Sequence, residues 1–212
     1  MKYIIMCGGK YPMWKNELKH MIPIKGEPLV ARTICLLREE GVDDIAISTQ
    51  DERFKQFGIP LLSHDNPFIA YNESTYWVDA FYPMREPVCY LMGDVVFSKN
   101  AIKTIVSDKV ESVEFYASAK PFSKDYIKRW EEPFAFKVND TEHFRRCIEL
   151  TKQYQDEKRF SRQPIAWELW QLVSGTAINH IVYNYHAIND FTCDIDEYED
   201  VALIEQKMVG YE

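Results

Sequence analysis

The sequence predicts a single α/β domain whose core is a Rossmann-like, doubly wound and mostly parallel β-sheet. Short apolar runs typical of buried strands alternate with amphipathic segments typical of helices, at the spacing of βαβ units. Two of the runs, Tyr3–Cys7 and Val88–Met92, are almost continuously apolar, as expected for strands buried on both faces. Because parallel strands end at one edge of a sheet, ligand-binding residues are expected at that edge.

The remaining elements follow from periodicity and from the residues that end each segment. Residues 29–40 place Val30, Ile34 and Leu37 on one face, and Gly41 can end that helix in the left-handed conformation. Further helices are predicted over residues 51–57, 75–81, 99–108, 141–155 and 165–173, with a last helix at the carboxyl end. Further strands are predicted over residues 44–49, 59–62, 113–118 and 134–138.

Length and charge restrict the possible functions. A chain of 212 residues with 46% apolar residues can bury one substantial core, which favours one domain. Its net charge of −8 argues against nucleic acid as a partner, because nucleic-acid backbones are bound by clustered Lys and Arg. The same charge means that a bound triphosphate would need a cation to offset the repulsion.

The cysteines and the apolar runs indicate a cytoplasmic protein. The five cysteines are odd in number and widely spaced without a C-x-x-C pair, which favours reduced thiols over a disulfide framework or a zinc site. The apolar opening is too short for a signal peptide, and no run approaches 18 apolar residues. A soluble protein without a membrane partner is therefore expected.

A glycine pair follows the first strand directly. Gly8 and Gly9 let backbone N–H groups approach an anion, and the lysines that follow at Lys10, Lys15 and Lys19 add positive charge. This pattern is compatible with a phosphate-binding loop. A glycine pair after a strand is also common in plain turns, and neither the dinucleotide fingerprint nor the P-loop consensus is present.

Acidic residues occur at two places where cation binding is plausible. Asp94 follows Gly93 at the end of the second long apolar run, on the edge where Gly8 is expected, and either caps a turn or binds a hard cation. Asp194 and Asp196 alternate along an extended segment and therefore face the same side. Asp196 is also placed to cap the last helix, an explanation that does not extend to Asp194.

The order of these blocks resembles the nucleoside-triphosphate transferase family, which includes sugar-phosphate and phosphocholine nucleotidyltransferases and molybdenum-cofactor guanylyltransferases. Lys19 stands before a segment similar to the family's "xxPxxGxPL", residues 91–98 are similar to its "LxGDxxF", and residues 194–200 to its "D-I-D-T-P-E-D". The first loop departs from the family's frequent G-x-G-[TS]-R, since its arginine is missing. Lys10 and Lys15 are the candidate replacements.

The resemblance implies a GT-A-type nucleotide-diphospho-sugar transferase fold and a Mg²⁺-dependent nucleotidyltransferase. The implied reaction transfers a nucleoside monophosphate from a nucleoside triphosphate to a small phosphorylated acceptor, such as a sugar phosphate or a phosphocholine-like molecule, and releases pyrophosphate. Lys19 and Asp94 are the implied catalytic residues, and Asp94, Asp194 and Asp196 the implied metal ligands. The expected nucleotide-binding residues are Cys7, Gly8, Gly9, Lys10, Lys15, Lys19, Asn72 and Ser74.

Several points stay open at this level. Asn72 and Ser74 also suit a plain loop and a helix cap. Residues 1–112 are expected to bind the nucleotide, residues 113–190 to form the acceptor side, and residues 191–212 to supply metal ligands and the final helix. CTP is favoured over other nucleotides by resemblance alone, and the acceptor and the oligomeric state are undetermined, with a homodimer as one expectation.

Two other functions compete with the transferase. A GT-A-type glycosyltransferase would also use a metal-bound nucleotide, although it typically carries a D-x-D motif where this chain has Gly93–Val96. A non-catalytic nucleotide sensor is suggested by the missing loop arginine. Pyrophosphate release separates the transferase from both, because a sensor releases none and a glycosyltransferase consumes a nucleotide sugar.

Overall fold

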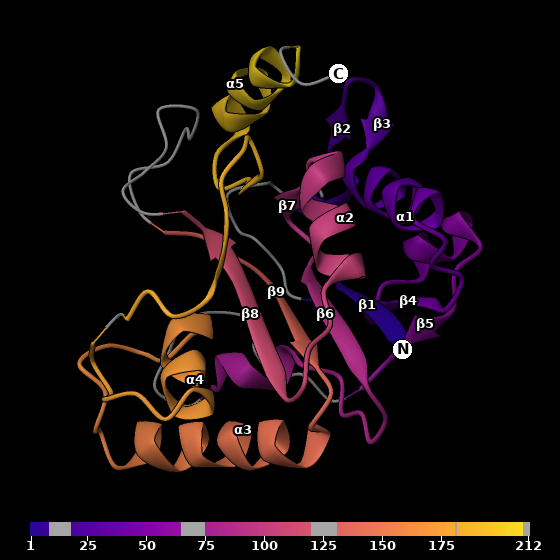
Figure 1. The fold of residues 1–212 in the computed structure, drawn as a ribbon. Helices are drawn as coiled ribbons and strands as arrows, with labels where there is room; N and C mark the ends of the chain where they lie inside the picture. Colours follow the sequence, from indigo (N-terminus) through magenta and orange to yellow (C-terminus); the bar gives the residue numbers. More distant parts are fainter. Residues whose placement is uncertain (9–17, 65–74, 120–130, 181, 210–212) are drawn as a thin grey trace.

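The computed structural model, which describes residues 1–8, 18–64, 75–119, 131–180 and 182–209, confirms the α/β fold (Figure 1). Its central sheet contains β1 (Lys2–Met6), β4 (Ile45–Ser48), β5 (Leu61–Leu62), β6 (Val88–Met92), β8 (Val113–Ser118), β9 (Pro133–Val138) and β10 (His186–Ile188). These seven strands lie in the order β10-β8-β9-β6-β1-β4-β5. All neighbours pair in parallel except β9, which runs antiparallel to both β6 and β8.

Two small two-stranded sheets and a set of helices complete the described chain. Strands β2 (Pro23–Ile24) and β3 (Glu27–Pro28) form a hairpin, and β7 (Val95–Val96) pairs antiparallel with β11 (Cys193–Asp194). The α-helices are α1 (Leu29–Glu39), α2 (Lys99–Ser107), α3 (Thr141–Asp156), α4 (Ala166–Val173) and α5 (Tyr198–Met208). Three 3₁₀ helices, η2 (Lys19–Met21), η3 (Glu52–Phe57) and η4 (Trp77–Ala80), lie between them.

The alternation of side chains along β9 shows how the helices cover both faces of the sheet. Phe136 packs against Phe144 of α3, with ring centroids 5.5 Å apart. The next residue, Lys137, points to the opposite face, where its Nζ donates to the carbonyls of Ile105 and Asp108 at the end of α2. Since successive strand residues face opposite sides, α3 and α2 cover different faces. The sheet is therefore the middle layer of three (Figure 1).

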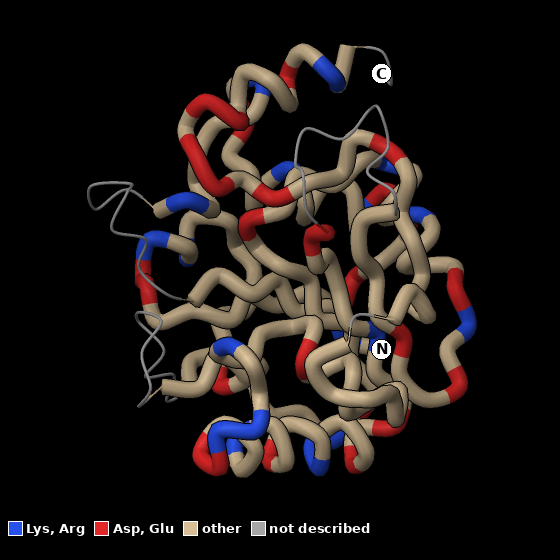
Figure 2. The backbone as a smooth tube through the Cα atoms, turned by 90° about the vertical axis from the view of Figure 1, so that its left-hand side faces the viewer, with Lys and Arg blue, Asp and Glu red and all other residues tan. Residues whose placement is uncertain are grey.

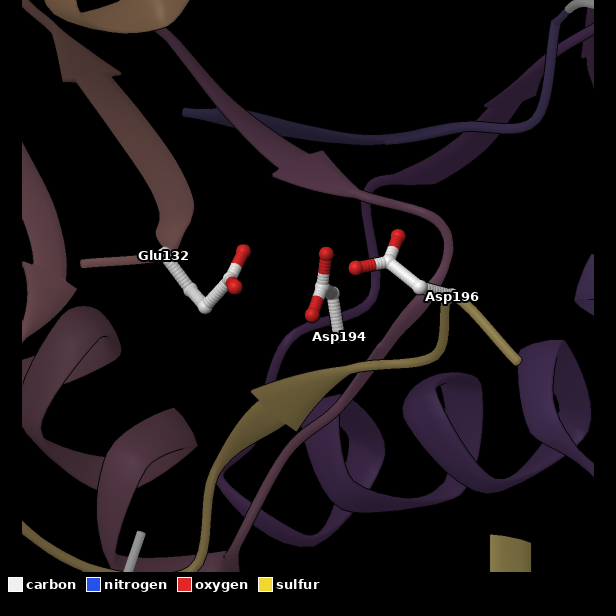
Figure 3. Close-up of side chains that lie close together, drawn as sticks. All are labelled: Glu132, Asp194 and Asp196. Carbon is white, nitrogen blue, oxygen red and sulfur yellow. The ribbon is translucent and has the colours of Figure 1, made fainter. Parts of the chain in front are cut away.

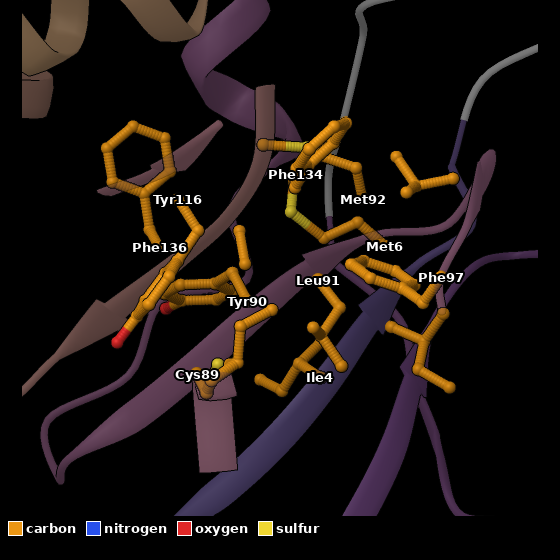
Figure 4. Packing of buried hydrophobic residues seen from close by; sticks show 14 of the residues in the cluster. Ile4, Met6, Cys89, Tyr90, Leu91, Met92, Phe97, Tyr116, Phe134 and Phe136 are labelled. Atoms are coloured by element: carbon orange, nitrogen blue, oxygen red, sulfur yellow. The ribbon is translucent and has the colours of Figure 1, made fainter. Parts of the chain in front are cut away.

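The core lies around β1 and β6, the two central strands. All five residues of β6 are buried, and in β1 only Lys2 is partly exposed. Figure 4 shows Ile4 and Leu91 from these strands packed close to each other, with aromatic side chains such as Phe97 and Phe134 nearby. This burial on both faces explains why the two segments read as continuous apolar runs rather than as alternating ones.

The strand order creates a switch point between β1 and β6. From β1 the chain continues outward to β4 and β5 on one side, whereas β6 lies on the other side. Met6 and Met92 are opposite each other at the carboxyl ends of these strands, so Gly8 and Asp94 follow at the same edge. In open α/β sheets ligands bind at such switch points. The expected position of the site is thus the top edge of the sheet in Figure 1.

Three predicted helices differ from the structure in type or in starting residue. The segment predicted as a helix over 75–81 is only the 3₁₀ helix η4, which begins after Tyr76. The helix predicted over 51–57 is the 3₁₀ helix η3, and Asp51 is its N-cap. The last helix begins after Glu197, so the prediction that Asp196 occupies its N-cap position is wrong.

No helix within the described ranges of the chain is long and apolar enough to cross a membrane.

Candidate active site

Lys19 is the buried cation at the switch-point edge. It opens η2, and its side chain is only 1% exposed. Its Nζ donates a 3.0 Å hydrogen bond to Asp94 Oδ2 and lies 3.6 Å from Asp196 Oδ1. The structure therefore brings together three residues that are far apart in the sequence, each from a different predicted block.

The electrostatics of this group favour charged side chains. Burial opposes the charge on Lys19, but the carboxylates of Asp94, Asp194 and Asp196 outweigh it and raise the pKa of the ammonium group. Burial likewise acts against ionisation of Asp94, but Lys19 and His20 outweigh it and lower the pKa of this carboxyl group. Near neutral pH the edge holds an ammonium group among carboxylates, an arrangement suited to phosphate and cation chemistry.

Asp94 owes its position to the tight approach of β6 and β1. The N–H of Gly93 donates to Met6 O at 3.0 Å, which continues the pairing of the two strands by one residue. A Cβ atom at position 93 would lie 2.2 Å from Met6 O and 2.8 Å from Cys7 Sγ, so only glycine fits there. Asp94 is turned out immediately after this contact, and 24% of its side chain is exposed.

A buried polar network holds the segment that carries the last two acids. Ser98 Oγ, which caps α2, donates to Asp190 Oδ2 at 2.5 Å, and the Ser98 N–H donates to Thr192 Oγ1 at 3.0 Å. The two residues after Thr192 form β11, which pairs with β7, and the N–H of Ile195 donates to Asp94 O at 3.0 Å. These bonds place Asp194 beside the end of β6.

Asp196 is oriented by the helix that follows it. The backbone N–H groups of Asp196 and Glu197 both donate to Asp200 Oδ2 at 2.9 Å. Asp200 therefore provides the capping carboxylate at this helix start, and the side chain of Asp196 is directed to Lys19 instead. Figure 2 shows acidic residues gathered where the chain enters α5, at the top of the molecule.

A third acid, Glu132, meets the two aspartates. One carboxylate oxygen from each of Glu132, Asp194 and Asp196 lies within 4.8 Å of the others. Figure 3 shows the three carboxylates turned toward a shared space, with Asp194 between the other two. Glu132 was not among the candidates from sequence. Its sequence signal is limited to an acidic pair, Glu131-Glu132, directly before a strand.

Comparison with solved structures finds nucleotidyltransferases that superpose on nearly the whole chain. A protein assigned as a glucose-1-phosphate thymidylyltransferase from Bacillus anthracis superposes with a TM-score of 0.60 and 16% identity, covering 97% of this chain and 94% of that one. The inositol-1-phosphate CTP transferase from T. maritima gives 0.57 and 12%, covering 99% and 97%. HddC from Yersinia pseudotuberculosis gives 0.56 and 15%, covering 98% and 99%. The chain has the nucleotidyltransferase fold.

Comparison of the sequence alone finds no relative, because no protein-family model and no curated protein matches the chain. The nucleotidyltransferase fold is thus recognised from three-dimensional structure and from short motifs, while overall identity to these structures stays at 16% or below.

The expected nucleotide-binding residues fall into two groups. Within the nucleotidyltransferase fold, Gly8 is exposed just past β1, whereas the side chain of Cys7 is buried and its N–H donates to Ser48 O at 2.9 Å. Any contact from Cys7 to a ligand would therefore involve its backbone carbonyl. The others, apart from Lys19, lie outside the described residues: Gly9, Lys10, Lys15, Asn72 and Ser74.

His20 is a buried neutral group beside the site. It packs near Phe54, and its Nδ1 has no hydrogen-bond partner among the described residues. Burial lowers the pKa of His20 to about 4, with Asp94 opposing the shift and Lys19 adding to it. Because the unfolded chain takes up this proton near pH 6.5 and the folded chain does not, stability declines as the pH falls from about 6.5 to about 4.

We expect this group to account for about 3 kcal/mol of the difference in unfolding free energy between pH 7 and pH 4. Urea unfolding at several pH values would test it. His20→Gln should show a shallower pH dependence than the wild type over this range, whereas the exposed His180→Gln should follow the wild type. Equal slopes for all three proteins would contradict the assignment.

Proposed function

We propose that the chain transfers a nucleoside monophosphate from a nucleoside triphosphate to a small phosphorylated acceptor and releases pyrophosphate. The observation that carries the proposal is the position of Lys19. A buried ammonium group, paired with Asp94 and Asp196, lies at the switch point of a nucleotidyltransferase fold. This is the place where the phosphates of a nucleotide are expected in an open α/β sheet.

In this proposal the triphosphate extends from the end of β1 toward Lys19. The exposed backbone at Gly8 faces the phosphates, and Gly9, Lys10 and Lys15 belong to the same proposed loop. Lys19 stabilises the negative charge that develops around the α-phosphorus. Such stabilisation is effective because the ammonium is buried and held in place before the reaction, so little reorganisation is needed.

The carboxylates fit the divalent cation that the resemblance implies. Hard cations prefer carboxylate oxygens, and a Mg²⁺–oxygen distance of about 2.1 Å separates opposite ligands by about 4.2 Å. That is the largest separation between two ligands of one Mg²⁺, and the oxygens of Glu132, Asp194 and Asp196 lie within 4.8 Å of one another, so small side-chain movements would bring all three to one cation. With Asp94 beside them, these residues would hold Mg²⁺, which when bound neutralises charge on the phosphate oxygens.

The reaction needs little else from the protein. An oxygen of the acceptor's phosphate attacks the α-phosphorus, a new P–O bond forms, and the bond to the β-phosphate bridging oxygen breaks with its electron pair leaving on pyrophosphate. A phosphate monoester is largely ionised at neutral pH because its second pKa is about 6, so a general base is unnecessary. Positioning and charge stabilisation are the main requirements of such transfers.

The finer assignments belong to the same proposal. We infer that residues 1–112 bind the nucleotide, that residues 113–190 form the acceptor side, and that residues 191–212 supply metal ligands and the final helix. CTP is the favoured nucleotide, and the inositol-1-phosphate CTP transferase among the structural neighbours is compatible with it. A cytoplasmic location, the absence of nucleic-acid and membrane partners and the homodimer remain predictions.

A direct assay tests the function. The protein is incubated with each nucleoside triphosphate, Mg²⁺ and a panel of sugar phosphates, polyol phosphates and phosphocholine, and pyrophosphate is measured. We expect release with one nucleotide and one acceptor class, and background release from Asp94→Ala. No release from any combination would refute a transferase and favour the sensor, whereas turnover of a nucleotide sugar would favour the glycosyltransferase.

A further inference from the structure

Glu132 comes from the half of the chain that the nucleotide motifs do not cover. It directly precedes β9 and is only 4% exposed. Because β9 runs antiparallel to β6, its first residue lies at the edge where β6 ends. The carboxylate of Glu132 therefore reaches the acids of the carboxyl-terminal segment from the opposite side, as Figure 3 shows.

The backbone of Glu132 is held in a way that fixes its side-chain direction. Its N–H donates to Ser118 Oγ at 2.8 Å, and its carbonyl accepts from Ser118 N–H at 2.9 Å. The pairing of β8 and β9 shifts register between Tyr116 and Ala117, and such irregularities re-aim side chains at strand ends. Pro133 restricts the preceding residue to extended conformations. These backbone contacts thus hold the Glu132 side chain in a fixed direction.

The charges of Glu132, Asp194 and Asp196 suit a bound divalent cation. Lys19 is a single ammonium group, and it pairs with Asp94 and Asp196. Placing a further carboxylate within 4.8 Å of Asp194 and Asp196 adds repulsion between like charges. A divalent cation between the oxygens turns that repulsion into attraction, because carboxylates are the ligands such cations prefer.

We propose that Glu132 is a further carboxylate ligand of the divalent cation, beside Asp194 and Asp196, and that this ligand allows the cation to bind before the nucleotide. Mg²⁺ sites that rely on substrate phosphates usually contain one or two carboxylates. Three converging carboxylates provide enough protein ligands for binding without phosphates. The inference rests on the proposed function, since the triphosphate reaction calls for the cation, but its test does not depend on turnover.

The test uses Mn²⁺ as the probe and nucleotide-free full-length protein. Titration followed by electron paramagnetic resonance should show one bound Mn²⁺ per chain for the wild type. Glu132→Gln should weaken binding on the order of tenfold or more, because it removes a charged ligand while keeping the side-chain size. The matched control is Glu131→Gln, since Glu131 accepts a hydrogen bond from Tyr183 OH instead and should leave Mn²⁺ affinity unchanged.

Thermal unfolding separates a ligand from a structural residue. The melting temperature of each metal-free protein serves as its own reference, and added Mn²⁺ should raise that of Glu132→Gln less than that of the wild type. If Glu132→Gln does not fold, Glu132→Asp retains the charge on a shorter arm and should weaken Mn²⁺ binding.

Wild-type protein that binds no Mn²⁺ without nucleotide, or a variant at position 132 that binds it as tightly as the wild type, would overturn the inference. The result is distinguishable from failure of the proposed function. If only the proposed function were wrong, Mn²⁺ would bind as expected, but no nucleoside triphosphate would yield pyrophosphate.

Discussion

Replacing Lys19 with alanine is expected to lower kcat/KM for pyrophosphate release by about 10³-fold or more. Preorganised groups that stabilise developing charge are typically worth 10² to 10³ in rate. Lys19 combines burial with a fixed position, since its ammonium contacts Asp94 at 3.0 Å and Asp196 at 3.6 Å. Its loss also removes the positive charge that contacts Asp94 and Asp196, which further disfavours an anionic substrate.

The matched control is Lys55→Ala. Lys55 also pairs with an acid, Glu52, but both side chains are exposed, and such surface pairs contribute about 0 to 1 kcal/mol. We expect its activity to equal that of the wild type. Circular dichroism should show that Lys19→Ala remains folded, because Asp94 and Asp196 retain partial contact with water, at 24% and 34% exposure. Activity retained in folded Lys19→Ala would refute the role of Lys19.

The second large effect is expected for Gly93→Ala, which should lower the free energy of unfolding by about 3 kcal/mol or more. The added methyl group would meet Met6 O at 2.2 Å, and this carbonyl accepts the N–H of residue 93 itself. Overpacking of a core usually costs about 1 to 3 kcal/mol, and backbone in a central strand has little freedom to move. Displacement of residue 93 would also shift Asp94, so activity should fall with stability.

Gly41→Ala provides the comparison, because it separates steric clash from backbone strain. Gly41 ends α1 with φ of +77°, and a Cβ atom there would have no neighbour within 4 Å. Only the left-handed conformation disfavours alanine at this position, at a cost of about 1 kcal/mol. Denaturant unfolding of both variants would check the difference. A loss in Gly93→Ala no larger than that in Gly41→Ala would contradict the close approach of β1 and β6.

Much of the candidate site is predictable because it follows from strand ends. Continuous apolar runs identify β1 and β6, and the residues after buried parallel strands lie at one edge of the sheet. That argument locates Gly8 and Asp94, and alternation along an extended segment explains why Asp194 and Asp196 face the same way. In the structure, Asp94 and Asp196 both lie close to Lys19 at this edge.

The sequence does not show which of two neighbouring groups makes a given contact. Asp196 and Asp200 are both chemically able to cap the last helix, and periodicity cannot distinguish between them. In the structure Asp200 accepts the two backbone N–H groups, which directs Asp196 to the site. Cys7 likewise belongs to the right strand end, but only the packing against Gly93 shows that its side chain is buried.

The sequence alone determined the fold class and placed Gly8 and Asp94 at one edge of the sheet, because these depend on hydrophobic pattern and order along the chain. Its resemblance to the nucleoside-triphosphate transferases added Lys19, Asp194 and Asp196 as candidates for the same edge. The tertiary structure decided that Glu132 joins them. A strand's composition does not reveal its direction, and it is the antiparallel direction of β9 that brings the residue before it to the edge where β6 ends.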